Sequence, residues 1–502
     1  MPSLPAKTEL LSHQPQRTLS LLDTTSIIVG IIIGSTIFKS SPIISAAAAG
    51  WTTATLQHYW NWPAAGDVNG LLLAQYLGIA LIWLLGGIIA LLGALCYAEL
   101  ATALPQEGGN YVFLTTAFGR RTGFAFAWTE FWIVRPGNIG AIAFVMATFA
   151  MQLLPESIKA TLGTRGEALL AVAAIAVLTA VNILGIQMER WTQNVLTAAK
   201  VLGLLFVAIT AWFLLTAPVA VTEVSQVPQP PTAMLPLAII LVMFAYGGWS
   251  DMSYVAAEVT DPNKNITRAL LLGTVAVTAI YLFLIFGFVH GLGLAGLYDS
   301  PSVASAVLYK SWGPWGDTAI SLLVVISCLG TIHGMLFTGA RVFYKLGSEH
   351  RMFRWLGKWN AKRDVPLRSL LAQSVVTIAL VMIFGSNAKA FEGLVVFTGP
   401  FYWGFICLVI LALVWLRWRG KLTSERYGVP FYPLPPILFS VACLWMCYEG
   451  VKYAWSNRAT AGLLYWWEGH WALAVVVIGL VLMFIDSREQ PPDANTAGSI
   501  KH

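Results

Sequence analysis

Apolar stretches of about 20 residues recur along the whole chain, and short polar segments separate them. A helix of this length crosses the hydrocarbon core of a bilayer, whereas a membrane barrel would show short segments of alternating polarity. The pattern predicts an all-α polytopic membrane protein with about 12 transmembrane helices. The predicted spans are residues 20–40, 76–103, 122–151, 168–187, 193–215, 234–258, 268–290, 316–345, 366–385, 393–416, 434–453 and 469–485.

Glycines interrupt two of the predicted spans. The first interruption lies around Gly30 to Thr36, and the second is the pair Gly247 and Gly248. Unwound backbone is tolerated at membrane depth only where it lines a cavity or is buried in protein. Interrupted spans at corresponding positions of two halves indicate the binding site of a secondary transporter. Taken alone, the spacing Gly30-x-x-x-Gly34 is equally typical of a helix-packing motif.

Composition and charge agree with a membrane location. The 502 residues are 57% hydrophobic and 11% charged, against about 25% charged in an average soluble domain. The segment from Arg341 to Arg368 carries eight of the 30 Lys and Arg residues. Basic residues accumulate on cytoplasmic loops, so we expect an integral protein of the plasma (inner) membrane with both termini in the cytoplasm. The net charge of +6 needs no nucleic-acid partner to explain it.

The five cysteines lie inside apolar stretches and show no metal-ligand spacing: Cys96, Cys328, Cys407, Cys443 and Cys447. Buried thiols usually act as small apolar residues. We therefore expect no structural disulfide, no metal and no cofactor. The chain also contains no H-E-x-x-H sequence and no nucleophile elbow, so we expect no enzymatic activity.

The chemistry of a broken helix suggests the ligand. Breaking a helix frees backbone N–H groups on one fragment and carbonyl groups on the other. The N-terminal end of a half-helix suits a carboxylate, while unwound carbonyls and C-terminal ends suit an ammonium group or a cation. An α-amino acid carries a carboxylate and an ammonium group close together. Two broken helices side by side therefore predict an amino-acid site.

Four motifs resemble those of one transporter family. They are Gly30 to Phe38, similar to G-x-I-I-G-S-G-I-F; Ala98-Glu99-Leu100 with Pro105 and Gly108-Gly109-Asn110-Tyr111; Glu130 followed by Arg135-Pro136; and Phe244 to Trp249 followed by Glu258, Pro262 and Arg268. With these motifs, the chain resembles the amino acid–polyamine–organocation (APC) superfamily, and within it the L-type amino acid transporters. The resemblance extends over about residues 18 to 420.

The resemblance implies a LeuT-like fold. In this fold a 5+5 inverted repeat contains discontinuous helices 1 and 6, here with two extra C-terminal helices. The expected parts are a cytoplasmic tail (1–18), a first repeat (19–215), an external linker (216–233), a second repeat (234–416), helices 11 and 12 (417–486) and a second cytoplasmic tail (487–502).

The resemblance also implies roles for single residues. It assigns the substrate carboxylate to the backbone N–H groups of Gly34, Ser35 and Thr36. The amino group is assigned to the carbonyls of Ile32, Phe244 and Gly247. The Phe244 ring would act as a gate, and Trp403 would line the side-chain pocket.

Lys200 is an ionisable residue in the apolar run from Val195 to Ile209. A charge at this depth is costly unless it has partners. One interpretation is a lysine that extends to the membrane interface. The resemblance implies instead that its ammonium replaces the cation of sodium-coupled relatives and braces the first helix against the eighth. That role predicts sodium-independent transport. A buried lysine is also easily neutralised, so Lys200 is a candidate proton carrier.

Four further ionisable residues are candidates for coupling or gating: Glu130, Arg135, Asp251 and His333. Glu130 and Arg135 are five positions apart, too far for an ideal helical pair. Asp251 is interpreted chiefly as the N-cap of the half-helix after the second break, and otherwise as a pocket carboxylate. His333 is interpreted chiefly as a core histidine, and otherwise as a pH sensor.

The sequence departs from the family pattern at three places. Thr36 stands where the family has glycine, which places a β-branched side chain beside the ligand. Ser250 stands where L-type members often have Asn. Eukaryotic L-type transporters bind a glycoprotein heavy chain through an external cysteine, but the segment from Gln152 to Glu167 has none. We therefore expect no disulfide-linked heavy chain.

Together these features predict a secondary active transporter, a permease or exchanger, that moves amino acids by alternating access without sodium. Its expected partners are an amino-acid substrate and the lipid bilayer. One alternative is a polyamine or organic-cation antiporter on the same fold, supported only by Asp251. Another is a non-transporting amino-acid sensor, which would be expected to carry a longer cytoplasmic tail.

Overall fold

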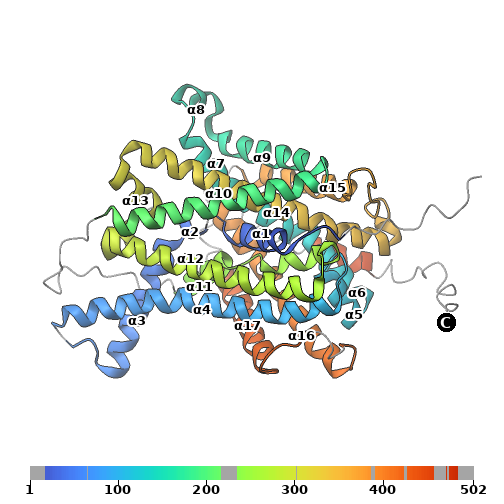
Figure 1. The fold of residues 1–502 in the computed structure, drawn as a ribbon, viewed down its shortest axis with the longest axis horizontal. Coiled ribbons are helices and arrows are strands. Elements are labelled where there is room, and N and C mark those ends of the chain that lie inside the picture. Colours follow the sequence, from blue (N-terminus) through green and yellow to red (C-terminus); the bar gives the residue numbers. More distant parts are fainter. Residues whose placement is uncertain are drawn as a thin grey trace, which may run out of the picture.

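The computed structural model describes residues 17–34, 36–64, 66–215, 235–300, 302–385, 390–422, 427–456, 471 and 474–483. This part of the chain is almost entirely helical, and its only β pairing consists of two isolated bridges. Most of the long helices run along the long axis of the molecule (Figure 1). The predicted all-α polytopic fold is confirmed.

The helices occupy most of the described chain. Their bounds are α1 (Leu21–Ile32), α2 (Thr36–Lys39), α3 (Ser41–Trp60), α4 (Val68–Ala103), α5 (Asn110–Phe118), α6 (Arg120–Thr129), the π-turn η2 (Glu130–Val134), α7 (Arg135–Gln152), α8 (Glu156–Leu162), η3 (Gly163–Arg165), α9 (Gly166–Ile183), α10 (Ile186–Phe213), α11 (Leu235–Ala245), the 3₁₀ segment η6 (Trp249–Glu258), α12 (Pro262–Asp299), α13 (Val303–Trp312), α14 (Pro314–Glu349), η7 (Arg351–Phe353), α15 (Leu367–Phe384), α16 (Ala390–Trp418) and α17 (Leu434–Ser456).

Within the described residues, 11 helices or helix pairs are long and apolar enough to cross a membrane. They correspond in order to the first 11 predicted spans. Of the twelfth, residues 469–485, the structure describes Trp471 and a shorter apolar helix, Ala474–Met483. The predicted external linker, residues 216–233, and most of both predicted tails lie outside the described residues.

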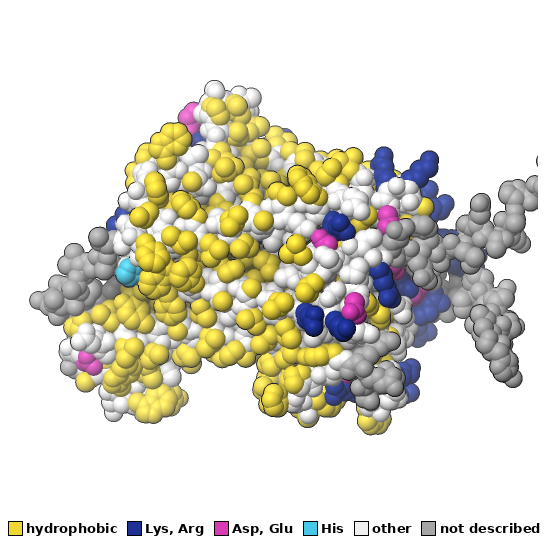
Figure 2. Space-filling model, viewed as in Figure 1, with side chains coloured by type: hydrophobic (Ala, Val, Ile, Leu, Met, Phe, Trp, Pro, Cys, Tyr) yellow, Lys and Arg dark blue, Asp and Glu magenta, His cyan; other side chains and the backbone are white. Residues whose placement is uncertain are grey.

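The surface separates into an apolar band and a basic end. Figure 2 shows hydrophobic side chains over most of the visible face, and Lys and Arg side chains gathered at one end of the long axis. Six exposed basic residues near η7 and the start of α15 belong to that end: Arg351, Arg354, Lys358, Lys362, Arg363 and Arg368. We call this end the basic end. Charged residues avoid the hydrocarbon core, so the band is the part that suits lipid contact.

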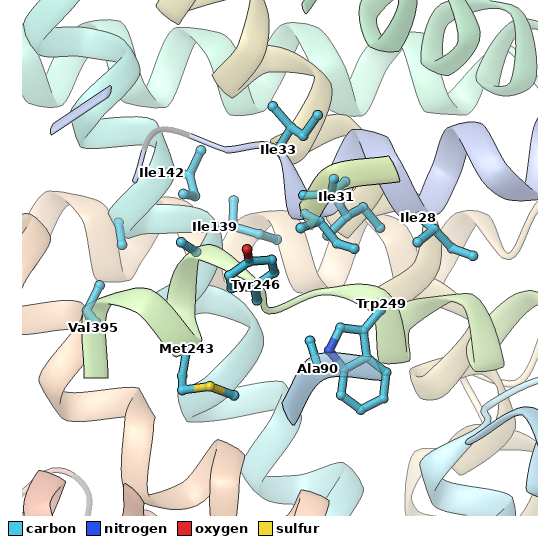
Figure 3. Packing of buried hydrophobic residues seen from close by; sticks show 14 of the residues in the cluster. Ile28, Ile31, Ile33, Ala90, Ile139, Ile142, Met243, Tyr246, Trp249 and Val395 are labelled. Atoms are coloured by element: carbon cyan, nitrogen blue, oxygen red, sulfur yellow. The ribbon is translucent and has the colours of Figure 1, made fainter. Parts of the chain in front are cut away.

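The first and sixth spans are discontinuous, as predicted. The first is broken between α1 and α2, and the sixth between α11 and η6. The two breaks lie side by side, because the hydroxyl of Tyr281 on α12 lies 3.2 Å from both the Ile32 and the Ala245 carbonyl oxygens. Figure 3 shows Ile31 and Ile33 on one broken span, close to Tyr246 and Trp249 on the other.

Aromatic packing against α4 and α12 fixes the second break. The rings of Trp83, Tyr246 and Tyr281 contact one another with centroid distances of 5.3–6.3 Å. The Tyr246 hydroxyl also donates to the Trp83 carbonyl at 2.9 Å. Three buried aromatic rings from α4, the break and α12 therefore hold the unwound backbone in one position.

Candidate functional site

A cavity lies between the two breaks. Its walls come from both broken spans and from α7, α14 and α16, with η2 at one side. Its volume, measured as the space open to the centre of a water molecule, is about 50 Å³, which is enough for several waters. The predicted site residues that line the cavity are Ile32, Gly34, Thr36, Glu130, Arg135, Phe244, Gly247, Gly248, Asp251 and Trp403.

The other predicted site residues lie elsewhere. Lys200 and His333 are buried and do not line the cavity. Ser35 lies outside the described residues. Gly30 lies within α1, two positions before the last helical residue.

Gly30 is a packing glycine rather than part of the break. A Cβ atom there would lie 2.2 Å from Nε2 of Gln193 and 2.4 Å from Oγ1 of Thr197 on α10. The helix continues through Gly30 to Ile32. The absence of a side chain at Gly30 lets α10 approach α1 closely. At Gly34, beyond the end of α1, a Cβ would meet nothing closer than Ile142 at 3.7 Å. Prediction of a break at Gly30 is therefore wrong, and the break begins at Ile33.

The second break requires glycine at Gly248. Its φ angle is +102°, in the left-handed region, and a Cβ would lie 2.5 Å from Cγ2 of Ile31. A side chain would thus be strained by its own backbone and would collide with the first broken span. The second break therefore depends on Gly248 for its close contact with α1.

Backbone groups within each break contact one another. The Gly34 N–H donates to the Ile32 carbonyl at 2.8 Å, and the Gly247 N–H donates to the Phe244 carbonyl at 3.1 Å. Each carbonyl oxygen has two lone pairs; the second lone pair of Ile32 faces the Tyr281 hydroxyl, which can turn to the Ala245 carbonyl instead. A ligand with an ammonium group can therefore bind these carbonyls without removing the turns.

Lys200 binds the last turn of α1 and the first residue of the break. Its Nζ donates to the Gly30 carbonyl at 2.6 Å and to the Ile33 carbonyl at 2.9 Å. It also lies 3.3 Å from the hydroxyl of Thr331 on α14, the eighth span. The side chain is fully buried, so it does not extend to the membrane interface. This geometry has the three parts that the family resemblance implied: the first helix, the eighth helix and the ammonium between them.

Glu130 and Arg135 form an ion pair despite their spacing. The Arg135 guanidinium lies 2.7 Å from Oε1 of Glu130. The backbone between them is the π-turn η2, in which the Arg135 N–H bonds the Glu130 carbonyl. A π-turn has an i→i+5 hydrogen bond, so residues five apart share one face. The spacing is too long for a pair on an ideal helix, and the π-turn is the distortion that brings the two side chains together.

Asp251 is not a helix N-cap. Gly248 occupies that position before η6 and makes no side-chain cap. The Asp251 carboxylate instead accepts from Arg135 on α7 at 2.5 Å and from the Thr338 hydroxyl on α14 at 3.0 Å. Both residues are nearly buried, with 7% of the Asp251 side chain and 4% of the Arg135 side chain exposed. The acid thus ties the second broken span to two continuous helices.

His333 is a buried residue of α14. Its Nδ1 lies 3.0 Å from Oε1 of Gln193, and its Nε2 has no partner among the described residues. Gln193 also packs against Gly30. The histidine therefore belongs to the packing between α10, α14 and α1 rather than to the cavity wall.

A second ion-pair group holds the far end of η6. Arg341 on α14 donates to Glu258 at 2.8 Å and to Glu189 on α10 at 3.2 Å. All three side chains are about 1% exposed. Removing one partner of such a buried pair costs about 3–5 kcal/mol, because a charge is left buried without compensation.

Glu107 lies close to this group, in the loop between α4 and α5. Burial raises the pKa of its carboxyl, and the negative charge of Glu258 raises it further. The nearby charges of Lys345 and Arg341 act in the opposite direction. At the end of η6 nearest the basic end, three carboxylates (Glu107, Glu189 and Glu258) thus lie near one arginine, Arg341.

On the side away from the basic end, aromatic rings close the cavity. The Phe244 ring contacts Phe391 on α16, with a centroid distance of 6.3 Å. The Lys39 ammonium lies over the other ring, 4.7 Å from the Phe391 centroid. Lys39 also lines a larger opening between α7, α13 and α14, with about 710 Å³ of room for water centres. These rings therefore lie between the small cavity and the wider opening.

Sequence reasoning missed several residues of the site. Tyr281 bridges the two breaks but carries no motif, because it is one tyrosine inside an apolar span. Asn138 and Tyr402 line the cavity, and the Asn138 amide oxygen accepts from Thr398 at 3.0 Å. Two sequence signals could have indicated that these residues line the site. Asn138 follows Arg135 by three residues, and Tyr402 is adjacent to Trp403.

Metal chemistry has no support in the described ranges. No three His, Cys, Asp or Glu side chains gather there in a group that could hold a metal ion. The charged groups of the site are paired with one another or with backbone carbonyls.

A polytopic helical protein with two broken spans around one cavity belongs to the class of secondary transporters. Comparison with known proteins identifies the family within that class. A family described as "Amino acid permease" matches residues 19–483. The chain belongs to this family, which confirms the predicted APC resemblance.

Characterised relatives cover most of the chain. The b(0,+)-type amino acid transporter 1 of Mus musculus is 30% identical over 447 residues, which are 86% of this chain and 83% of the relative. The large neutral amino acids transporter small subunit 2 of Homo sapiens is 28% identical over 94% of this chain and 80% of its own length. The Asc-type amino acid transporter 1 of Mus musculus is 29% identical over 85% of this chain and 75% of the relative.

Proposed function

We propose that the protein transports amino acids by alternating access, as a permease or exchanger. The observation that carries this proposal is the convergence of two unwound segments on one cavity. The cavity offers the backbone of Gly34 and Thr36 to a carboxylate, and the carbonyls of Ile32, Phe244 and Gly247 to an ammonium group. Its relatives are named as amino acid transporters.

The substrate has a neutral side chain in this proposal. Beyond the breaks, the cavity wall includes Val134, Ile142, Met335, Val395 and Trp403. An apolar wall favours an uncharged side chain, because a buried charge needs a partner. Phe244 acts as the gate on one side, with its ring against Phe391.

Transport needs no sodium in this proposal. The Lys200 ammonium donates to the Gly30 carbonyl in the last turn of α1, to the unwound Ile33 carbonyl and to Thr331, which are oxygen ligands of the kind that a sodium ion uses. A fixed ammonium in this position leaves no room for a second cation. If Lys200 loses its proton during the cycle, it would serve as the proton carrier instead.

The basic end faces the cytoplasm in this proposal, and the protein lies in the plasma membrane. Exposed basic residues near η7 and α15 support this orientation. We further propose that the protein performs no covalent chemistry. It functions without a disulfide-linked heavy chain, because residues 152–167 contain no cysteine.

The polyamine alternative rested on Asp251 as a pocket carboxylate. That carboxylate already accepts from Arg135 and Thr338. Binding a polyamine there would require it to give up a buried guanidinium. The geometry therefore favours the amino acid.

The experiment is uptake into liposomes that contain the purified protein. Liposomes preloaded with unlabelled amino acids are exposed to each labelled amino acid and to labelled putrescine, with and without sodium and a pH gradient. We expect uptake of neutral amino acids without sodium, and none in liposomes without protein. Uptake of no amino acid contradicts the proposal, and a strict sodium requirement contradicts the role of Lys200. Uptake that needs an inward proton gradient would show proton coupling, and its loss in Lys200→Ala would then support Lys200 as the carrier.

A further inference from the structure

The 3₁₀ segment η6 has the features of a movable element. It is ten residues long, whereas 3₁₀ runs of more than three or four residues are uncommon and often mark a hinge. A residue with positive φ lies just outside each end, Gly248 at +102° and Asp261 at +45°. These two turns allow η6 to change direction relative to α11 and α12.

The start of α1 is attached to η6. The N–H groups of Thr18 and Leu19 both donate to the Glu258 carbonyl at 2.9 Å, and the Thr260 N–H donates to the Leu19 carbonyl at 2.9 Å. Displacement of η6 would therefore carry the beginning of the first span with it. Such a displacement would open the basic end.

Two ion-pair groups, each made of one arginine and two carboxylates, hold η6 in place. The cavity group is Asp251 on η6 with Arg135 and Glu130; the end group is Glu258 on η6 with Arg341 and Glu189. In each group the arginine belongs to a long continuous helix, α7 or α14. The second carboxylate also lies off η6, on η2 or on α10.

Each group holds one carboxylate more than it needs. One acid would neutralise one guanidinium, and a second buried carboxylate has a desolvation penalty. In the end group this excess is visible, since Oε1 of Glu189 is buried without a hydrogen-bond partner among the described residues. Static packing therefore gives no reason for the third charge.

Movement of η6 gives the reason. If η6 left an arginine that had no other acid, the guanidinium would stay buried without a counter-charge, and that state is strongly unfavourable. A carboxylate that stays behind removes the penalty. The departing acid would meanwhile enter the water that fills the opening.

We propose that Glu130 and Glu189 are the resident partners of Arg135 and Arg341, and that η6 opens the basic end by exchanging ion pairs. Arg135 passes from Asp251 to Glu130, and Arg341 passes from Glu258 to Glu189. Glu189, Arg341 and Glu258 are then positioning residues of the transport cycle, although none of them lines the cavity. This inference rests on the proposed function, because it assigns the charges to alternating access.

The test uses the end group, which is remote from the ligand. Ala256 on η6 is fully buried, so an Ala256→Cys thiol reports movement of η6 by its reaction with a maleimide. The full chain in lipid nanodiscs is labelled with and without a transported amino acid. The unsubstituted chain, whose own cysteines are largely buried, gives the background.

Opposite effects are expected from the two acids. Glu189→Gln removes the resident partner, so labelling and the maximal uptake rate should fall about tenfold while KM stays unchanged. Glu258→Gln releases η6, so labelling should rise. Glu99→Gln is the matched control, because Glu99 is a buried carboxylate paired with Arg417 away from η6. It should lower the thermal midpoint without changing the labelling of a folded sample.

The inference is overturned if Glu189→Gln and Glu258→Gln change labelling in the same direction, or if neither changes it. Glu189→Asp keeps the charge and should restore most of the labelling. Labelling is also measured without substrate, so it stands apart from the proposed function. Absence of amino-acid uptake with intact opposite labelling would contradict the transport assignment alone.

Discussion

The two broken spans are held by opposite chemistry. At the first break, the backbone itself supplies the ligands, since the Gly30 and Ile33 carbonyls accept from the Lys200 ammonium. At the second, carboxylate side chains of η6 bind arginines on neighbouring helices. The first break is thus held by one cation on α10 together with the Ser327 and Thr331 hydroxyls on α14. At the second break, each arginine has two acids to choose from. We infer that the first break is a fixed point and the second a movable one.

Removing the cation of the first break should have the largest effect. Lys200→Ala removes the charged donor of two buried carbonyls and leaves them only the Ser327 and Thr331 hydroxyls. Each lost hydrogen bond to a charged group is worth about 1.5–3 kcal/mol. We expect liposome uptake to fall below about one hundredth of the parent value. Uptake is measured on protein that elutes as a single folded species.

A lysine outside the site provides the control for this change. Lys345 pairs with Glu349 near the surface, so Lys345→Ala should change uptake less than about twofold. Uptake by Lys200→Ala at the level of this control would show that the first break does not need its cation.

The turn of the second break is the next most sensitive position. Gly248→Ala places a side chain at a φ of +102° and 2.5 Å from Ile31. The backbone strain is about 1–3 kcal/mol, and overpacking adds about 1–3 kcal/mol. We expect a lower thermal midpoint and uptake reduced about tenfold or more.

Gly119→Ala separates the two contributions. Gly119 has a φ of +92°, but a Cβ there would meet nothing within 4 Å. Its variant should show the backbone strain alone, and hence a smaller drop in the thermal midpoint. Equal drops for the two variants would mean that contact between the broken spans at Gly248 is unimportant.

The smallest effect is expected at Thr36. This residue is nearly buried and lines the cavity at the start of α2. Thr36→Gly enlarges the cavity, so the ratio of uptake between large and small neutral amino acids should rise about two- to fivefold. Competition among labelled amino acids measures the ratio.

Thr36→Ser distinguishes the methyl group from the hydroxyl. A serine with the substrate range of the glycine variant would assign the restriction to the methyl group. If neither variant changes the ratio, Thr36 does not limit the side-chain pocket.

Much of the fold was readable from the sequence. The long apolar stretches predicted the spans, because a membrane helix needs a minimum apolar length that few other structures share. The pair Gly247 and Gly248 located the second break closely. Family membership followed from motifs around both breaks, and the family match over residues 19–483 confirms it.

Local geometry was harder to read. The role of Gly30 cannot be read from the sequence, because the same residue type serves in helix packing and in helix breaks. The π-turn at Glu130 was invisible, since its i→i+5 pairing is produced by the surrounding helices rather than by a residue pattern. The partner of Asp251 lies 116 positions away, so only the tertiary structure could reveal it.

Tyr281 places a single proton between two acceptors. Its hydroxyl lies 3.2 Å from the Ile32 carbonyl and 3.2 Å from the Ala245 carbonyl, yet it can donate to only one at a time. Whenever substrate competes for the Ile32 oxygen, the hydroxyl is free to turn to the other span. A fluorinated tyrosine at this position would thus act as a spectroscopic reporter that signals occupancy from inside the protein, with no label on the substrate.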